Sequence, residues 1–177
     1  MKLFILTIYF LLPLSGGINS KTIHPFVDKT IASIPVGEHS EATVFKLYGR
    51  GVYIAKDDAI CYYNKKEKNF LIVWYGEDKI IASVTIVKEG YENNWGQCKK
   101  KKIYANLETG KGIKLNDSLE KIIKIYGEPI KREMKDGVLT LYYNTDYTKD
   151  PQVLLFYDVI LNFKNGRLVE LFIHDGD

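Results

Sequence analysis

The chain has 177 residues, of which 46% are hydrophobic and 27% charged, with a formal net charge of +3. This length is enough for one domain with a substantial core. The nearly balanced charge argues against a nucleic-acid-binding protein, because such domains carry a pronounced basic excess, so we expect no nucleic-acid partner.

The first 20 residues have the composition of a secretory signal peptide. Lys2 precedes an apolar run at 3–14, and small and polar residues follow that run. The run is shorter than the roughly 20 apolar residues that a membrane-spanning helix needs. We therefore expect an exported protein, periplasmic or secreted, that is cleaved after Gly17 or Ser20. An uncleaved membrane anchor is the alternative.

Residues 21–87 are predicted to form a first α+β unit. The segment 36–49 has the apolar positions of a short helix and ends in Tyr-Gly, and strand-like apolar runs occupy 70–75 and 80–87. A helix end followed by strands separated by turn residues is typical of a helix packed on an antiparallel sheet.

Residues 88–111 are predicted to be a polar linker between two units. The linker contains Cys98 and one charge run, Lys99, Lys100, Lys101 and Lys102. Four adjacent ammonium groups are candidates for contact with an anionic surface, such as lipid headgroups or an acidic protein. A solvated loop is the alternative, and membrane association is not the favoured interpretation.

Residues 112–177 are predicted to form a second unit, and it begins with the best-specified stretch of the chain. Asn116, Asp117 and Ser118 can each accept a hydrogen bond at the start of a helix, while Gly127 and Pro129 are typical of its end. Apolar side chains at positions 119, 122, 123 and 126 share one side of that helix.

Two turn dipeptides divide the rest of the second unit into hairpins. Asp136-Gly137 separates strand-like runs at 130–134 and 138–143, and Asn165-Gly166 separates runs at 153–163 and 168–173. The second unit therefore reads as one helix followed by four antiparallel strands, with the helix covering one face of the sheet.

The two units are similar to each other in sequence. Residues 36–49 align with 114–127 at an offset of 78, and both segments end in Tyr-Gly. With two extra residues allowed in the second copy, Tyr62-Tyr63-Asn64 aligns with Tyr142-Tyr143-Asn144. A repeat of this kind indicates duplicated structural units. We predict an α+β fold of two tandem helix-plus-four-strand antiparallel repeats, with the helices packed on one face of the sheet.

The chain has two cysteines, Cys61 and Cys98. An exported protein meets an oxidising compartment, where an even number of cysteines favours disulfide pairing. We expect a Cys61–Cys98 bond that ties the linker to the first sheet. Two free buried thiols are the alternative.

No catalytic or metal-binding pattern is present in the sequence. The three histidines, His24, His39 and His174, have neither metal-ligand nor triad spacing, and the chain contains no HExxH, GxSxG or CxxC motif. We therefore expect a non-enzymatic protein without catalytic residues, bound metal or cofactor.

Aromatic residues are abundant, with 13 tyrosines, 8 phenylalanines and 2 tryptophans. If helices cover one sheet face, strand alternation leaves part of this set on the other face. Tyrosine and tryptophan are enriched at protein-binding surfaces. We expect Tyr62, Trp74, Tyr142 and Tyr143 to bind a partner, and core filling is the alternative.

The stretch Thr109-Gly110-Lys111-Gly112-Ile113-Lys114-Leu115-Asn116-Asp117-Ser118, followed by Tyr126-Gly127-Glu128-Pro129, resembles the "GI-x-LGDS … YG-x-P" opening of the β-lactamase-inhibitor-protein-like fold. The small outer-membrane assembly lipoproteins of the SmpA/OmlA type use the same fold. Asn116 stands where that motif has glycine. The resemblance implies tandem helix-plus-sheet units and an envelope or extracellular location.

Members of that superfamily act by binding another protein, as inhibitors or as scaffold subunits. The resemblance therefore implies an exported inhibitor- or adaptor-like protein that binds a protein partner, of unknown identity, through an aromatic sheet face. The alternative is a membrane-associated scaffold or assembly accessory protein of the bacterial envelope.

Overall fold

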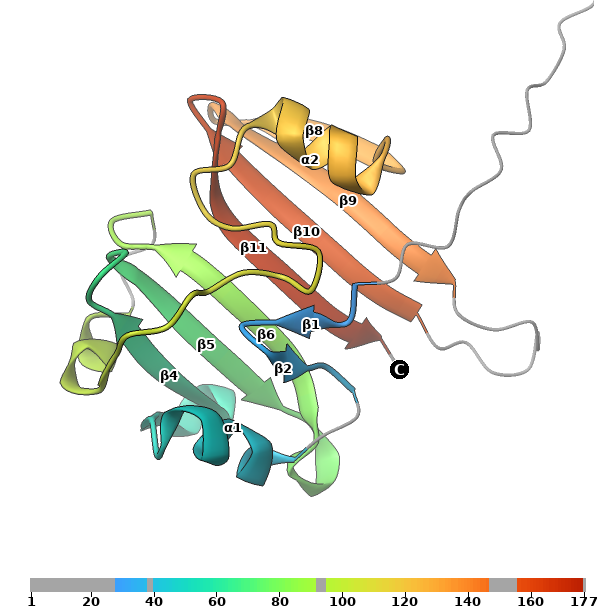
Figure 1. Cartoon of the computed structure of the whole chain (residues 1–177). Coiled ribbons are helices and arrows are strands. Elements are labelled where there is room, and N and C mark those ends of the chain that lie inside the picture. Colours follow the sequence, from blue (N-terminus) through green and yellow to red (C-terminus); the bar gives the residue numbers. More distant parts are fainter. Residues whose placement is uncertain (1–27, 38–39, 92–94, 147–155, 177) are drawn as a thin grey trace, which may run out of the picture.

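The computed structural model describes residues 28–37, 40–91, 95–146 and 156–176, and the predicted signal peptide lies outside these residues. Strands are the main regular structure of the described residues, and they form a nine-stranded sheet and a separate two-stranded hairpin (Figure 1). Within the described part, no helix has both the length and the apolar character needed to cross a membrane.

The elements follow in a simple chain order. The small hairpin comes first, with β1 (Thr30–Ile31) and β2 (Ile34–Pro35). The helix α1 (Glu41–Tyr48) precedes β3 (Val52–Ile54), the 3₁₀ turn η1 (Ala55–Asp57), β4 (Ala59–Asn64), β5 (Asn69–Tyr75), η2 (Glu77–Lys79) and β6 (Ile81–Lys88). A connecting stretch holds η3 (Gly96–Lys100) and β7 (Lys102–Ile103). The helix α2 (Leu119–Tyr126) precedes β8 (Lys131–Lys135), β9 (Val138–Asp146), β10 (Phe156–Lys164) and β11 (Arg167–Gly176).

The strands of both halves belong to one sheet, in the order β3-β4-β5-β6-β11-β10-β9-β8. The halves join where β6 and β11 pair antiparallel, from Ser83 opposite His174 to Val87 opposite Glu170. β7 pairs in parallel with β4 beside β3. Two separate four-stranded sheets would each leave a further edge of unpaired backbone groups, and the β6–β11 pairing removes both edges.

The α+β class fits this structure, but the predicted organisation, two tandem helix-plus-four-strand repeats with helices packed on one face, is wrong. One continuous sheet with a shared core replaces two repeats. The helices do not form the expected layer, because each is eight residues long and has one fully buried side chain, Val44 in α1 and Ile122 in α2.

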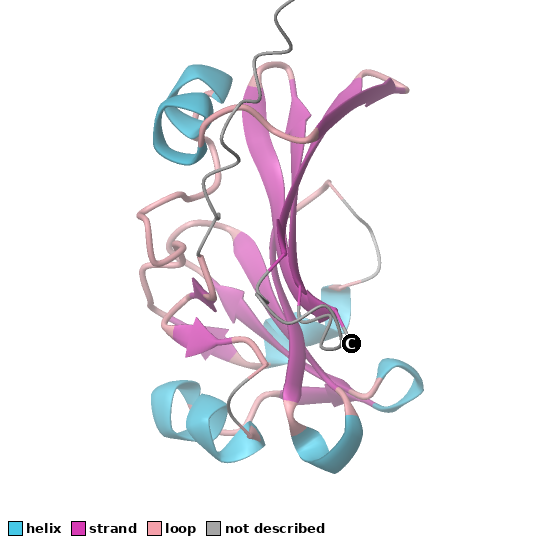
Figure 2. Cartoon of the chain, turned by 90° about the vertical axis from the view of Figure 1, so that its right-hand side faces the viewer, coloured by secondary structure: helices cyan, strands magenta, loops and turns pink. Residues whose placement is uncertain are grey.

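Other segments complete the cover of the helix-bearing face. Figure 1 shows the β1–β2 hairpin and the connecting segment 103–118 crossing the sheet between α1 and α2, and Figure 2 shows the same layer edge-on. Ile31, Ile34, Leu107 and Ile113 from these segments are fully buried in the main core. The predicted polar linker therefore contributes buried side chains, because short helices alone cannot cover so wide a sheet.

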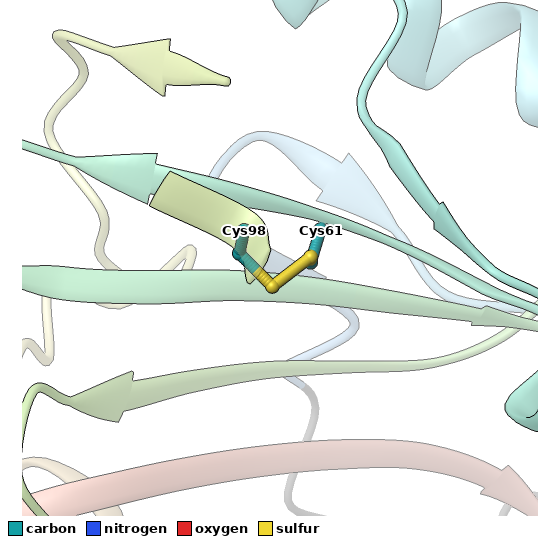
Figure 3. The surroundings of a disulfide bond; sticks show 2 residues. All are labelled: Cys61 and Cys98. Carbon is teal, nitrogen blue, oxygen red and sulfur yellow. A yellow bond between two sulfur atoms is a disulfide. The ribbon is translucent and has the colours of Figure 1, made fainter. Parts of the chain in front are cut away.

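The predicted disulfide is confirmed and lies on the opposite face of the first half (Figure 3). Cys61 of β4 bonds to Cys98 of η3, with 5.4 Å between the Cα atoms, and both residues are fully buried. Ile54, Phe70 and Ile72 pack around them in a second, smaller core. The bond therefore holds η3 against β4, as a cross-link between the connecting stretch and the sheet.

The local signals around α2 act as the sequence indicates. Ser118 is the N-cap, and its hydroxyl accepts a hydrogen bond from the Lys121 backbone N–H at 3.3 Å. At the other end, the Gly127 N–H donates to the Ile123 carbonyl, and Gly127 has a φ of 80°. Asp117 does not cap the helix; its carboxylate accepts from the Lys114 N–H and pairs with the Lys121 ammonium at 2.7 Å.

We predict that Ser118→Ala lowers the free energy of unfolding by about 1 kcal/mol, because one helix-start N–H loses its acceptor. Ser40 offers a matched control. It occupies the N-cap of α1 but makes no side-chain cap hydrogen bond there. Ser40→Ala should therefore change the urea midpoint much less than Ser118→Ala, and equal shifts for the two variants would contradict this assignment of the cap.

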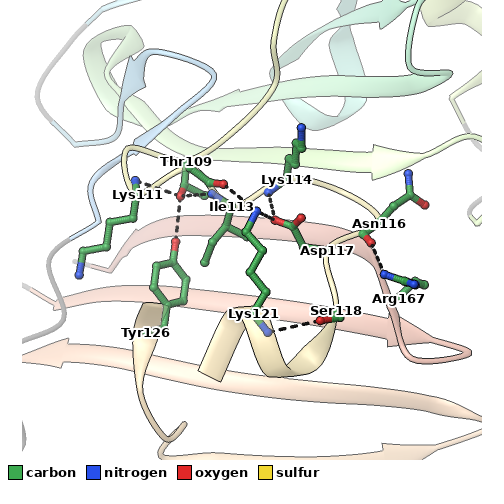
Figure 4. A network of polar contacts seen from close by, with 11 residues as sticks. Thr109, Lys111, Ile113, Lys114, Asn116, Asp117, Ser118, Lys121, Tyr126 and Arg167 are labelled. Carbon is green, nitrogen blue, oxygen red and sulfur yellow. Dashed lines mark hydrogen bonds and ion pairs between the residues drawn. The ribbon is translucent and has the colours of Figure 1, made fainter. Parts of the chain in front are cut away.

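A polar network fixes the connecting segment 103–118, called the crossing segment below, to α2 (Figure 4). The same network reaches Asp28 at the start of the described chain. Thr109 Oγ1 accepts from the Ile113 N–H at 3.3 Å and lies 3.1 Å from the Tyr126 hydroxyl. That hydroxyl donates to Asp28 at 2.7 Å, and Asp28 also accepts from the Gly110 and Lys111 N–H groups. The motif that carries the family resemblance thus has a structural role here.

Candidate protein-binding surface

A row of apolar and aromatic side chains crosses the second half of the sheet, on the face opposite the helices. Tyr142 of β9 lies opposite Ile160 of β10, and Ile160 lies opposite Phe172 of β11. Directly opposed residues of antiparallel strands present their side chains side by side on one face. All three side chains are partly exposed. We call this surface, with Trp74 and His174, the open face.

Trp74 and His174 extend the row toward the first half of the sheet. The Trp74 and Phe172 rings meet edge to face with centroids 6.3 Å apart, and Phe172 stacks on His174 at 5.9 Å. Trp74 also meets Trp95 edge to face at 6.1 Å. Such edge-to-face and stacked contacts stabilise pairs of rings, so the rings of the open face form one connected aromatic surface.

Polar groups border the aromatic row on one side. Thr140 donates to Asn162 Oδ1 at 2.7 Å, and the Asn162 amide donates to Glu170 at 2.5 Å, which makes a chain of contacts across β9, β10 and β11. Asp158 is partly exposed on the other side of the row, opposite His174. The open face therefore has an apolar centre and a polar, mainly acidic border.

The outer end of the row is fixed by a smaller set of contacts on β8. The Tyr142 hydroxyl donates to Glu133 at 2.7 Å, and the Lys131 ammonium pairs with Glu133 at 2.6 Å and lies 5.2 Å from the Tyr142 ring centre. The Glu133 carboxylate raises the pKa of Tyr142. Lys131 first, and Tyr142 second, hold the pKa of Glu133 below its usual value. Tyr142 thus stays a neutral hydrogen-bond donor.

Two of the four predicted partner-binding residues do not lie on the open face. Tyr62 and Tyr143 are buried in the main core on the helix side, with 0% and 4% of their surface exposed. Each hydroxyl donates to the carbonyl of a glycine that ends a helix: Tyr62 to Gly49 at 2.7 Å, and Tyr143 to Gly127 at 3.1 Å. They hold the helix ends on the sheet and are not available to a partner.

The other two predicted residues, Trp74 and Tyr142, do share the open face, although three strands lie between β5 and β9. Sequence reasoning missed the residues that connect them, Ile160, Phe172 and His174. The signal that could have found them is strict alternation in β11, where Leu171 and Ile173 are fully buried and the residues after each are partly exposed.

The four lysines of the predicted run have different surroundings. Lys99 pairs with Glu89 and lies 5.6 Å from the Tyr63 ring centre. Lys102 belongs to β7, and the Lys101 carbonyl accepts from the Tyr63 N–H at 2.8 Å. Lys100 is exposed on η3. Contact of the run with an anionic surface stays a prediction. The described residues include no group of three or more His, Cys, Asp or Glu residues placed to hold a metal ion.

The sequence matches no family model and no curated protein. The fold is similar to the crystal structure of YjgB, a DUF4309 family protein from Bacillus subtilis, with a TM-score of 0.50 and 11% sequence identity over 80% of this chain and 82% of that chain. At that identity the likeness concerns the fold alone. The resemblance to the β-lactamase-inhibitor-protein-like fold stays a prediction.

Proposed function

We propose that this chain is an exported, non-enzymatic binding protein that holds a protein partner against the open face. The observation that carries the proposal is the in-register row Tyr142–Ile160–Phe172, partly exposed and continued by Trp74. Exposed, contiguous aromatic and aliphatic side chains are costly in water, and they are typical of surfaces that a partner covers.

The chemistry of the border indicates what kind of partner surface fits. The border of the apolar centre carries three carboxylates, from Glu133, Asp158 and Glu170, and Lys131 is paired with the first of them. A matching partner would insert an aliphatic or aromatic side chain beside Phe172 and place basic residues over the border, because complementary charges favour encounter and orientation. The disulfide fits an exported protein, since such bonds persist in oxidising compartments.

The proposal predicts that Phe172→Ala and Tyr142→Ala each weaken capture of a partner about 30-fold, the effect of losing about 2 kcal/mol at the centre of an interface. The mature chain would be immobilised and exposed to exported proteins from the source cells, and bound proteins would be quantified by mass spectrometry. The matched control is Tyr104→Ala, because Tyr104 is a tyrosine that is 73% exposed just after β7, away from the open face.

Only proteins that bind the parent chain and Tyr104→Ala, and that both open-face variants lose, support the proposal. Thermal unfolding of each variant would show that the sheet is intact. Partners retained equally by all four chains would contradict the assigned surface. If the chain forms a dimer that the open-face variants abolish, the partner on the open face is a second copy of this chain.

A further inference from the structure

A small pocket lies at the end of the sheet where β11 runs past β6. The two strands pair only from Glu170 onward, so the first residues of β11 stand beside the turn that follows β6. The pocket has a volume of about 320 Å³, with Lys88, Glu89 and Tyr91 on one wall and Lys164, Arg167 and Val169 on the other. It is separate from the open-face row.

The pocket carries an excess of positive charge. Lys88, Lys164 and Arg167 contribute three cations, and among the described residues none of them has an ion-pair partner. The one lining carboxylate, Glu89, is already used: it pairs with Lys99 and accepts a hydrogen bond from the Tyr63 hydroxyl at 2.8 Å. Lys99 first, and Tyr63 second, lower the pKa of Glu89, which therefore stays ionised and bound to Lys99.

Asn116 holds two of these cations in place. Its side-chain oxygen accepts from the Lys88 ammonium at 2.8 Å, and its backbone carbonyl accepts from the Arg167 guanidinium at 3.3 Å (Figure 4 shows the second contact). Asn116 itself is fixed in the left-handed region, with a φ of 69°, and its N–H donates to the Leu168 carbonyl. Asparagine tolerates that conformation and adds an acceptor that glycine would lack.

We infer that this pocket binds a phosphate-type anion, namely a small phosphate monoester or the phosphate of a lipid headgroup. A tetrahedral oxyanion, doubly charged in a monoester and singly charged in the phosphodiester of a lipid headgroup, offers several acceptor oxygens to two ammonium groups and one guanidinium. The volume lies at the lower end of the range for small-molecule pockets, which leaves room for a small group beside the phosphate. Tyr91 and Val169, one from each side of the pocket, provide apolar surface for that group.

The test is calorimetric titration of the mature protein with glycerol 3-phosphate and, separately, co-sedimentation with vesicles containing phosphatidylglycerol. Lys164→Ala and Arg167→Ala should each weaken binding at least about tenfold, because each removes a charge-assisted contact. Lys135→Ala is the matched control: Lys135 is the exposed last residue of β8, at the same end of the sheet, but does not line the pocket. It should bind as the parent chain does.

The outcomes separate the two sources of the phosphate. Saturable binding of glycerol 3-phosphate without sedimentation on vesicles would assign a soluble monoester, and sedimentation that glycerol 3-phosphate competes away would assign a lipid headgroup. Absence of binding in both arms overturns the inference. Binding that Lys135→Ala weakens as much as Lys164→Ala does would also overturn it, because general charge attraction would then explain the effect. Lys164 is the exposed last residue of β10, so its variant should fold normally.

Discussion

Replacing Cys61 and Cys98 together by alanine is expected to lower the free energy of unfolding by about 4 kcal/mol. The bond closes a loop with a sequence separation of 37 residues, and its removal restores that chain's freedom in the unfolded state. Alanine is the right replacement because both sites are fully buried and apolar, and a serine hydroxyl would need a hydrogen-bond partner. Urea unfolding of the mature protein measures the change.

The loss should concentrate around η3. Apart from the bond, this 3₁₀ helix is held by the small core around Cys98 and by the hydrogen bond from the Tyr63 N–H to the carbonyl of Lys101, the residue that ends it. The Lys99–Glu89 ion pair is solvent-exposed and contributes little. Amide exchange at 96–101 should therefore accelerate more than exchange in β10. The parent protein treated with a reductant provides the control, since it should lose a similar amount of stability. Unchanged unfolding in both samples would show that η3 is fixed by packing alone.

Features that depend on sequence neighbours were predictable. The turns Asp136-Gly137 and Asn165-Gly166 both join hairpin strands, and all four residues have positive φ, between 50° and 76°. Asn, Asp and Gly are the residues that occupy that conformation most easily, so the signal is local. The Ser118 cap depends on residues within one turn in the same way. The disulfide could be predicted from the even number of cysteines and the expected oxidising compartment.

The face on which each tyrosine lies was not predictable from the same information. Tyr62-Tyr63 and Tyr142-Tyr143 are adjacent pairs, and in any strand one member of such a pair faces the core. Tyr62 faces the helices in the first pair, whereas Tyr143 does so in the second. Aligning Tyr62 with Tyr142 therefore placed residues of opposite orientation together. The choice depends on which hydroxyl can reach a helix-ending glycine carbonyl, and that is a tertiary contact.

The joining of the two halves was also beyond the sequence pattern. β6 and β11 read as ordinary apolar strands, and nothing in either identifies the other as its partner. β6 and β11 pair because each is the uncovered edge strand of its own half and because the two halves share one core. The basic pocket exists only because of this pairing, so Lys88 and Arg167, far apart in the chain, could not have been grouped from sequence alone.

Asp28→Ala is expected to lower the free energy of unfolding by about 3 kcal/mol, because three donors lose a buried, charged acceptor. Each donor keeps only a neutral acceptor: the Thr30 carbonyl for the Gly110 N–H, and Thr109 Oγ1 for the Lys111 N–H and the Tyr126 hydroxyl. Asp28 is 3% exposed and accepts from the Gly110 N–H at 3.1 Å, the Lys111 N–H at 3.2 Å and the Tyr126 hydroxyl at 2.7 Å. Burial first, and the Asp28 charge second, raise the pKa of Tyr126, which keeps this hydroxyl a donor.

Tyr126→Phe separates the role of the carboxylate from that of the ring. It removes one donor but leaves the two backbone N–H groups bound to Asp28, so its cost should be about 1.5 kcal/mol. The double variant should lose less stability than the sum of the two single-variant losses, because both changes break the same hydrogen bond. Exchange of the Gly110 and Lys111 amides should accelerate in Asp28→Ala and remain slow in Tyr126→Phe. Full additivity, or equal exchange in both variants, would contradict this role of the network. The buried apolar residues of the crossing segment, such as Leu107 and Ile113, would then be what holds it on the sheet.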